Sequence, residues 1–136
     1  MDYKLELVVV PVTDVDRAKA FYAERAGFRV DVDHRAGEDF RVVQLTPPGS
    51  ACSITLMRNE EAAGSVHGLH LVVGDIEAAR ADLVSRGVEA SELFHFGAGG
   101  QEAGPHPERE SYGTFLSFSD PDGNGWLVQE VPSRPT

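Results

Sequence analysis

The sequence contains a single cysteine, Cys52, among its 136 residues. An intramolecular disulfide is therefore excluded, and a lone thiol in the apolar stretch "ACSITLM" is more typical of a core residue than of a nucleophile. Basic residues are scarce too, since 12 Lys and Arg stand against 22 Asp and Glu, for a net charge of -10. This negative charge repels phosphate backbones and anionic lipids, so neither nucleic acid nor membrane is an expected partner.

Long apolar runs are also missing. No stretch approaches the roughly 20 residues needed to span a bilayer. The opening "MDYKLELVVV" lacks the basic leader and cleavage site of a signal peptide, so we expect a cytoplasmic location. The composition, 41% hydrophobic and 25% charged, is ordinary for a globular protein. A chain of this length forms one compact domain or two small modules that share a core.

Two segments of the chain resemble each other. "VTDVDRAKAFYAERAGFRV" and "VGDIEAARADLVSRGVEA" both carry Val-x-Asp, then an aliphatic residue, an acid and Ala-Lys/Arg-Ala. Each follows an apolar run and repeats its apolar residues at helical spacing, which predicts an amphipathic helix after a strand. Asp14 and Asp75 are the predicted N-caps, and Gly27 and Gly87 stand where left-handed C-caps are favoured.

Strand-like runs with turn signals between them follow each predicted helix, so each half reads as a βαβββ unit. The predicted modules are residues 1–57 and 66–132, joined by a polar linker at 58–65. Neither half buries its apolar face alone, which favours one curved sheet with helices on its outside. The sequence "DPDG", residues 120–123, suits a type I turn before the last strand and needs no chemistry to explain it.

"VTDVDRAKAFY", "VGDIEAARADL" and "FSDPDGNGW" occur in an order and spacing that resemble the vicinal oxygen chelate superfamily of glyoxalase I, extradiol dioxygenases, and bleomycin and fosfomycin resistance proteins. The resemblance covers nearly the whole chain. It implies an α+β fold in which two βαβββ modules form a U-shaped mixed sheet around a cavity, with the helices on the convex side. It also implies a homodimer and a small organic molecule as ligand or substrate.

Enzymes of this superfamily hold a divalent metal with His, Glu or Gln side chains, at positions that the resemblance places on Leu7, Thr55, Gly68 and Leu127. Three of these residues have no ligating side chain, and a single Thr hydroxyl is a poor ligand. We therefore expect no metal and no other cofactor, and glyoxalase I and dioxygenase activity are disfavoured. A shift of one residue in the inferred strand register would reopen the metal hypothesis.

Strand alternation identifies the candidate site residues. His67 and His70 are three positions apart, so on a strand they face opposite sides and cannot bind one ion. His70 shares parity with Gly68 and is the candidate acid or base, the alternative being a hydrogen-bonded core histidine. The other candidate ligand-binding residues are the four family metal positions and further residues expected near the cavity. They are Leu7, Ser53, Thr55, Met57, Gly68, Tyr112, Leu127 and Gln129. Arg29, Asp31 and Asp33 either face the cavity or lie on a solvated face.

The segment at 97–111 shows no helical or strand periodicity and is long for a connection. It is either a lid, to which His95, His106, Arg109 and Tyr112 would belong, or a surface loop. Among the aromatic residues, Phe94, Phe96 and Trp126 are expected near the cavity mouth.

Three functions remain open. The first is a metal-free protein of the glyoxalase and bleomycin-resistance type that traps a planar or aromatic compound in an apolar cavity. The second is a metal-independent isomerase, epimerase or cyclase that acts on a carbonyl compound, with His70 as acid or base. The third is a metal-dependent lyase or dioxygenase whose ligands are displaced from the usual positions.

Overall fold

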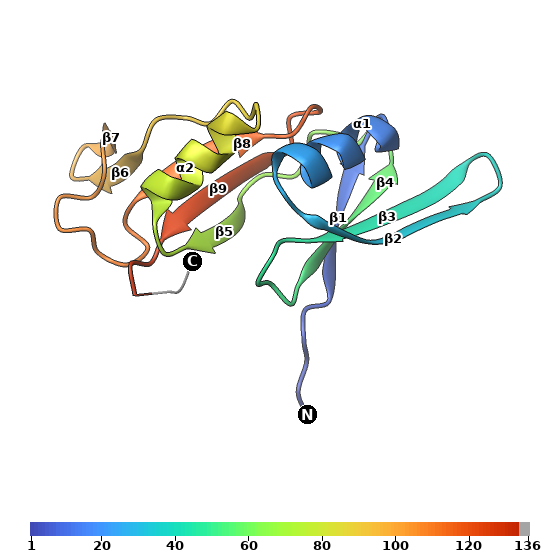
Figure 1. Cartoon of the computed structure of the whole chain (residues 1–136), viewed down its shortest axis with the longest axis horizontal. Helices are drawn as coiled ribbons and strands as arrows, with labels where there is room; N and C mark the ends of the chain where they lie inside the picture. Colours follow the sequence, from blue (N-terminus) through green and yellow to red (C-terminus); the bar gives the residue numbers. More distant parts are fainter. Residues whose placement is uncertain (134–136) are drawn as a thin grey trace. The chain divides into compact units, whose positions relative to one another are not determined.

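The computed structural model describes residues 1–133, which form two compact units (Figure 1). The first unit contains residues 1–66 together with 120–124, and the second contains residues 67–119 and 125–133. Each unit has one sheet, and a helix packs on one face of that sheet. The α+β fold class inferred from the sequence is therefore confirmed.

The first unit has the predicted βαβββ order. Its elements are β1 (Leu7–Val12), α1 (Val15–Ala20) continuing into the π-helical turn η1 (Phe21–Arg25), β2 (Arg29–Ala36), β3 (Phe40–Thr46) and β4 (Ser53–Arg58). The strand order in this four-stranded sheet, sheet 1, is β1-β4-β3-β2. Strands β1 and β4 run parallel, and the other neighbours are antiparallel.

The helix of the first unit forms where its caps predict. The Asp14 carboxylate accepts a hydrogen bond from Arg17 N at 3.1 Å, which satisfies one of the free N–H groups of the first turn. Gly27 ends the helical segment with φ +80°, a conformation that favours glycine. The buried residues of this segment form the core with the apolar residues of sheet 1, namely Val10, Val12, Val15, Ala18, Phe21, Tyr22, Val43, Leu45, Ile54 and Leu56.

The second unit contains one strand more than the sequence indicated. Its elements are β5 (Leu69–Val73), α2 (Ile76–Ser85), β6 (Phe94–Gly97), β7 (Gly100–Ala103), β8 (Phe115–Ser119) and β9 (Gly125–Glu130). They form the five-stranded sheet 2, in the order β5-β9-β8-β6-β7. The segment at 97–111 was expected to be free of strands, but its first part pairs with β6 as a hairpin. Residues 88–93, expected to be strand, contain none.

Helix α2 packs on one face of sheet 2. The Asp75 carboxylate accepts from Ala78 N at 3.1 Å, so the second predicted N-cap is also confirmed. On β9, Trp126 and Val128 are buried and share their face with Glu130, which accepts a hydrogen bond from the first amide of α2. Trp126 stacks on Phe118 on that helix side. Trp126 therefore lies on the opposite face from Phe94 and Phe96, with which it was expected near a cavity mouth.

A β-bulge in β2 changes which side chains of that strand face the helix. The pairing steps from Val30 opposite Leu45 to Val32 opposite Gln44, so Asp31 is the extra residue. Asp33 consequently faces α1, where it forms ion pairs with Lys19 and Arg41. These donors hold the pKa of the Asp33 carboxyl well below its usual range. Of the two alternatives for Asp33, the structure therefore supports a place on the surface beside α1.

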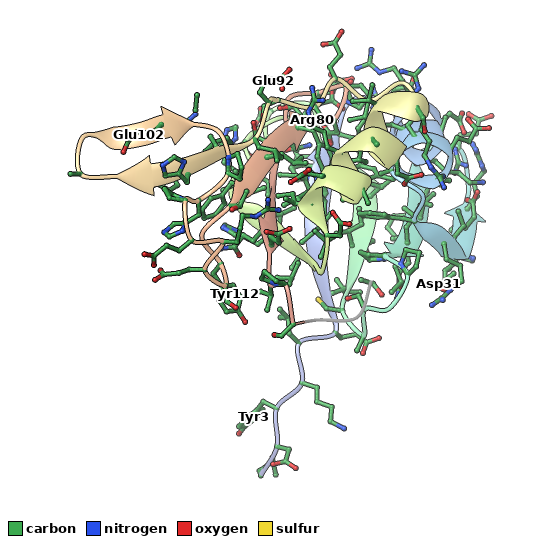
Figure 2. The ribbon with its side chains drawn as sticks, turned by 60° about the vertical axis from the view of Figure 1, so that its left-hand side comes forward. Tyr3, Asp31, Arg80, Glu92, Glu102 and Tyr112 are labelled. Carbon is green, nitrogen blue, oxygen red and sulfur yellow. The ribbon has the colours of Figure 1, made fainter. Side chains whose placement is uncertain are left out.

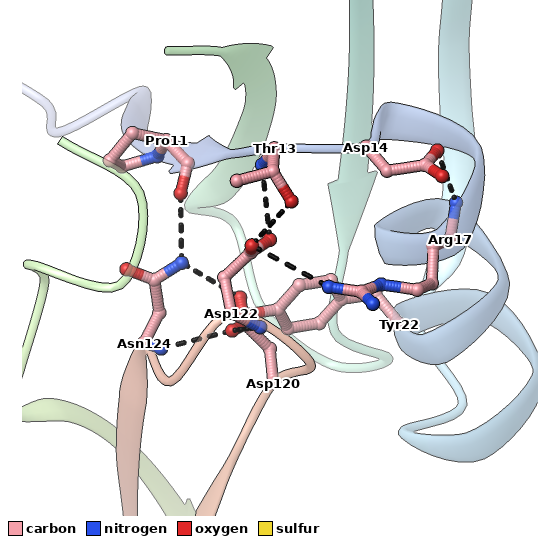
Figure 3. A network of polar contacts seen from close by, with 8 residues as sticks. All are labelled: Pro11, Thr13, Asp14, Arg17, Tyr22, Asp120, Asp122 and Asn124. Carbon is pink, nitrogen blue, oxygen red and sulfur yellow. Dashed lines mark hydrogen bonds and ion pairs between the residues drawn. The ribbon is translucent and has the colours of Figure 1, made fainter. Parts of the chain in front are cut away.

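The turn at 120–124 packs within the first unit (Figure 3). The buried Asp120 carboxylate accepts hydrogen bonds from Tyr22 Oη at 2.8 Å, from the backbone N–H of Asp122 and Asn124, and from Asn124 Nδ2. Asn124 Nδ2 also donates to the Pro11 carbonyl, and Thr13 donates to the Asp122 carboxylate. The side chains of Asp120, Asp122 and Asn124 all have structural partners, so the sequence "DPDG" is explained as scaffold.

Candidate functional site

Sheet 2 presents a face rich in aromatic side chains on the side opposite α2. Cross-strand pairs share a face, so Val72, Gln129, Phe115 and Phe94 form one row across β5, β9, β8 and β6. His70, Leu127 and Ser117 form the next row. We call this surface, with Phe96 on β6, the aromatic face.

Three phenylalanines form a cluster on the aromatic face. Phe94 and Phe115 stack with ring centroids 5.7 Å apart, and Phe96 meets Phe115 edge to face at 5.3 Å. Phe94 and Phe115 are buried, whereas Phe96 is 57% exposed. The packed pair thus fixes the position of an exposed ring whose surface is available for stacking.

A pocket of about 430 Å³ opens beside this cluster. Its lining is mixed and consists of Ser91, Glu92, Leu93, Phe94, Gln101, Glu102, Ala103, Ser117 and Leu127. Small-molecule sites in proteins usually have this size and combine apolar walls with a few polar groups. Leu127, a predicted ligand-binding residue, lies at this pocket, and Gln129 lies on the same face.

His70 lies on the aromatic face, opposite Leu127 in the neighbouring strand, as its parity predicted. Its Nδ1 is 2.5 Å from the carbonyl oxygen of Gly68, which has φ +81°. A carbonyl only accepts, so Nδ1 is the donor in this bond, and in the neutral form of the ring Nε2 carries the electron pair. His70 is exposed rather than packed in a core, which does not support the alternative of a core histidine.

Sheet 1 carries a row of hydroxyl groups on the face opposite α1. Ser53 and Thr55 on β4 lie on this face, and Leu7 and Val9 of β1 are opposite them. Thr46 of β3 joins them through a contact of 2.6 Å between its Oγ1 and Ser53 Oγ. We call this surface the hydroxyl face. Thr46 and its bond to Asp31 were not singled out from the sequence, because the bond joins two strands at the bulge of β2.

Thr55 has an unusual environment on the hydroxyl face. Its side chain is 5% exposed, and its Oγ1 is fully enclosed with no hydrogen-bond partner. No other enclosed side-chain nitrogen or oxygen within residues 1–133 shares this property. A buried polar atom without a partner is unfavourable, so this position calls for an explanation.

The four family metal positions do not offer a set of donors that fits a divalent ion. Leu7 and Leu127 are hydrocarbon, Gly68 has no side chain, and Thr55 supplies one neutral hydroxyl. Protein sites for such ions use several imidazole, thiolate or carboxylate groups. Among the residues that the structure describes, no three His, Cys, Asp or Glu side chains gather closely enough to hold an ion.

The segment that follows β7 forms hydrogen bonds with β9 of its own unit. Figure 2 labels Glu102 on the β6–β7 hairpin and Tyr112 beyond it. Arg109, at φ +52°, donates through Nε and Nη2 to the buried Glu130 carboxylate at 2.9 and 2.8 Å. Tyr112 N donates to the Glu130 carbonyl. Donation by Arg109 lowers the pKa of the Glu130 carboxyl, against the opposing effect of burial.

Of the predicted site residues, Leu127 alone lines the pocket on the aromatic face. Tyr112 is half exposed and is not part of the pocket lining. Met57 is half-buried at the end of β4, near a separate charged hollow with Arg41 and Arg58. Ser53 and Thr55 belong to the hydroxyl face. Phe115 contacts both other rings of the cluster, but the sequence analysis did not single it out. The alternation in "FLSFS" is the signal that could have identified it.

No helix in residues 1–133 is both long and apolar enough to cross a membrane.

Comparisons with known proteins agree with this architecture. The chain is 30% identical to TnmS3, an antibiotic binding protein from Streptomyces sp. CB03234, with a TM-score of 0.74 and coverage of 95% of this chain and 96% of that one. It is 32% identical to a glyoxalase/bleomycin resistance protein from the same organism, with a TM-score of 0.71 and coverage of 93% and 100%. The uncharacterized protein YetH of Bacillus subtilis is 28% identical over 90% of this chain and 94% of its own length.

The family itself is shown by a match that spans most of the sequence. Residues 4–128 match the family model of the glyoxalase superfamily. The repeated strand-helix units, the two N-caps and the turn at 120–124 all lie within that range. The chain therefore belongs to the Glyoxalase/Bleomycin resistance protein/Dioxygenase superfamily.

Proposed function

We propose that this protein binds a planar, largely apolar small molecule on the aromatic face, without a divalent metal. The observation that carries the proposal is the Phe94, Phe96 and Phe115 cluster beside the pocket of about 430 Å³. An exposed aromatic ring held by two buried ones offers a rigid stacking surface at little entropic cost. Similarity to a protein described as antibiotic binding supports a role in sequestration.

Polar groups around the cluster would set the orientation of the bound molecule. Gln129 and Ser117 lie on the same face as Phe115, in its own row and the next. Glu92 and Glu102 line the pocket and make its rim acidic. These carboxylates, together with the net charge of -10, favour neutral or cationic compounds over anionic ones.

A fluorescence titration tests this proposal with 9-anthracenemethanol, a neutral planar fluorophore. We expect saturable binding with one probe per chain, and mass spectrometry should recover the probe unchanged. Phe96→Ala removes the exposed stacking surface and should weaken binding about tenfold, since aromatic contacts contribute about 1 kcal/mol beyond burial of area. Phe40→Ala is the matched control, because Phe40 is 47% exposed and lies on β3 in the first unit. Equal affinity of the two variants would contradict the proposal.

A second candidate function is a metal-independent isomerase, epimerase or cyclase that uses His70. The bond to Gly68 leaves Nε2 as the free basic atom, on the face that carries the pocket residue Leu127. In such an enzyme, Nε2 of His70 would accept a proton from the substrate carbon beside a carbonyl group and would return it to the substrate at another position. Turnover that survives chelator and disappears in His70→Ala would support this function, and unchanged turnover in His70→Ala would remove His70 from the role.

The homodimer implied by the family and the cytoplasmic location remain predictions. Sedimentation velocity of the purified chain over a range of concentrations tests the dimer directly.

A further inference from the structure

A second cavity, of about 590 Å³, lies between α2 and the segments at the two ends of the β6–β7 hairpin. We call it the α2 cavity. Its lining residues, all in the second unit, are Glu77, Arg80, Ala81, Glu92, Leu93, Ala103, Gly104 and Pro105. The pocket on the aromatic face shares three of them, but the α2 cavity contains no residue of β8 or β9. It is therefore a separate recess, which neither of the functions proposed above uses.

Hydrogen bonds hold the walls of the α2 cavity in place. Arg80 Nε donates to the Ser91 carbonyl at 2.8 Å, which links α2 to the segment before β6. Gly104 N donates to the Leu93 carbonyl at 2.9 Å, and His95 Nδ1 lies 2.8 Å from the Gly104 carbonyl. The segments before and after the hairpin are thus joined to each other. A ligand would enter a preformed space, which lowers the entropic cost of binding.

The apolar part of the α2 cavity is built from short side chains. Ala81 lies on the helical wall, on the same face of α2 as Glu77, four positions before it. Ala103 and Pro105 belong to the opposite wall; they and Ala81 are exposed, and Leu93 is half-buried. Small-molecule sites combine such apolar walls with a few polar groups that fix orientation. The walls therefore suit a compact apolar body.

The charged residues of the α2 cavity differ in how firmly they are paired. Glu77 accepts a hydrogen bond from Arg109 Nη1 at 2.8 Å. Arg80 Nη2 is 3.2 Å from Glu92, labelled beside it in Figure 2, whose side chain is 89% exposed. Within residues 1–133, Arg80 Nη1 has no hydrogen-bond acceptor. An ion pair with so exposed a carboxylate contributes little, so Glu92 is a partner that Arg80 can exchange.

We propose that the α2 cavity binds a small apolar carboxylic acid in its ionised form. The ligand carboxylate accepts hydrogen bonds from Arg80 Nη1 and Nη2 and displaces Glu92 into solvent, since two N–H groups of a guanidinium match the two carboxylate oxygens. The apolar body contacts Ala81, Leu93 and Pro105. This exchange replaces one carboxylate by another beside Arg80, so the local charge is unchanged, while apolar surface is removed from water.

The test uses three probes that share a cyclohexane ring, which has no flat face for stacking on aromatic side chains. Cyclohexanecarboxylate is the anion, cyclohexanecarboxamide the uncharged analogue and cyclohexylmethylamine the cation. They are titrated at pH 7 into the full-length ¹⁵N-labelled protein, in about 0.15 M salt, which screens the net charge of -10 beyond about 8 Å.

We expect the carboxylate to shift the NMR amide signals of Arg80, Ala81 and Gly104 in a saturable manner. The carboxamide should bind about tenfold more weakly, because it lacks the charge that strengthens hydrogen bonds from a guanidinium. The amine should not shift these signals. Absence of saturable shifts with the carboxylate, equal or tighter binding of either other probe, or shifts confined to Ser117 and Leu127 on the aromatic face would overturn the proposal.

Substitution of Arg80 tests its role as the carboxylate-binding group. Arg80→Gln should weaken binding of cyclohexanecarboxylate about tenfold. Arg86→Gln is the matched control, because it removes the same charge at the end of the same helix, where Arg86 pairs with Asp82 outside the cavity. Equal affinities of the two variants would overturn the proposal.

Substitution of Glu92 tests the exchange of partners and leaves Arg80 intact. Glu92→Gln removes the competing carboxylate and should tighten binding of cyclohexanecarboxylate about threefold. Glu89→Gln is the control, since Glu89 is exposed and does not line the cavity, so it reports only the loss of one negative charge. The same change of affinity in both variants would show that Glu92 acts only through net charge and would overturn the proposed exchange.

Discussion

At the scale of single residues, hydrogen bonding distinguishes buried polar groups that stabilise the fold from buried polar groups that do not. Asp120 is buried and accepts four hydrogen bonds, so it is fully used by the structure. Thr55 is equally buried, but its hydroxyl has no partner. The hydrogen bonds of Asp120 stabilise the fold, whereas the unpaired hydroxyl of Thr55 lowers its stability.

Replacing Thr55 tests this difference without a ligand. Thr55→Val keeps the shape of the side chain and removes an unsatisfied hydroxyl, so it should raise the free energy of unfolding by about 1 kcal/mol. Thr114→Val is the control, because Thr114 is fully buried and its Oγ1 accepts from His106 N at 3.0 Å. That variant should lower stability by a similar amount. Urea unfolding measures both, and a loss of stability in Thr55→Val would show that its hydroxyl has a partner.

Glu130 predicts how stability depends on pH. Its pKa in the folded protein lies below its ordinary value of 4.5, since Arg109 donates two hydrogen bonds to the charged form. At low pH the unfolded chain then binds more protons than the folded one, so this stabilisation is present above about pH 4.5 and is lost as the pH falls. Glu130→Gln should lower the free energy of unfolding at pH 7 by about 2 kcal/mol, and this free energy should then depend less steeply on pH in the acid range. The same change at the exposed Glu108 should leave the dependence on pH in the acid range unaltered.

At the scale of elements, much of the fold could be predicted because its signals are local. The two Asp N-caps and the apolar spacing of both helices depend on neighbours within one turn. Strand parity was correct on β5 and β9, where His70 and Leu127 share a face as expected. These are regular strands, in which alternation alone determines the side that each residue faces.

Prediction failed where the backbone departs from regular alternation or where pairing partners are distant. The bulge at Asp31 reverses the parity of the rest of β2, and nothing in "RVDVDH" marks it. Strand β7 has the sequence Gly-Gln-Glu-Ala, which has low strand propensity and is held by its pairing with β6. The hydrogen bonds from Asp31 through Thr46 to Ser53 join three strands, so their existence depends on tertiary register.

The turn at 120–124 gives the sharpest prediction at this scale. Asp120→Ala leaves the Tyr22 hydroxyl and the turn amides without their acceptor in a buried place, and should lower the free energy of unfolding by about 3 kcal/mol. Pro121→Ala, at an exposed position in the same turn, should change it by less than about 0.5 kcal/mol. Thermal and urea unfolding of both variants measure the difference, and equal effects would contradict a scaffold role for Asp120.

At the scale of the whole molecule, the chain combines the fold of its superfamily with a cluster of aromatic side chains on sheet 2. The resemblance places the metal positions of the superfamily's enzymes on Leu7, Thr55, Gly68 and Leu127, of which only Thr55 has an oxygen atom in its side chain. On sheet 2 the exposed ring of Phe96 packs edge to face on Phe115, whereas the hydroxyl groups of Ser53 and Thr55 on sheet 1 are buried. Fold membership alone does not assign catalysis.

The most direct test of metal-free binding is a fluorescence titration of 9-anthracenemethanol, made with protein dialysed against EDTA and repeated with saturating Ni²⁺ or Zn²⁺. The account predicts the same affinity in all three conditions, because none of the groups on the aromatic face depends on an ion. Affinity that is lost after EDTA and restored by one equivalent of metal per chain would contradict it.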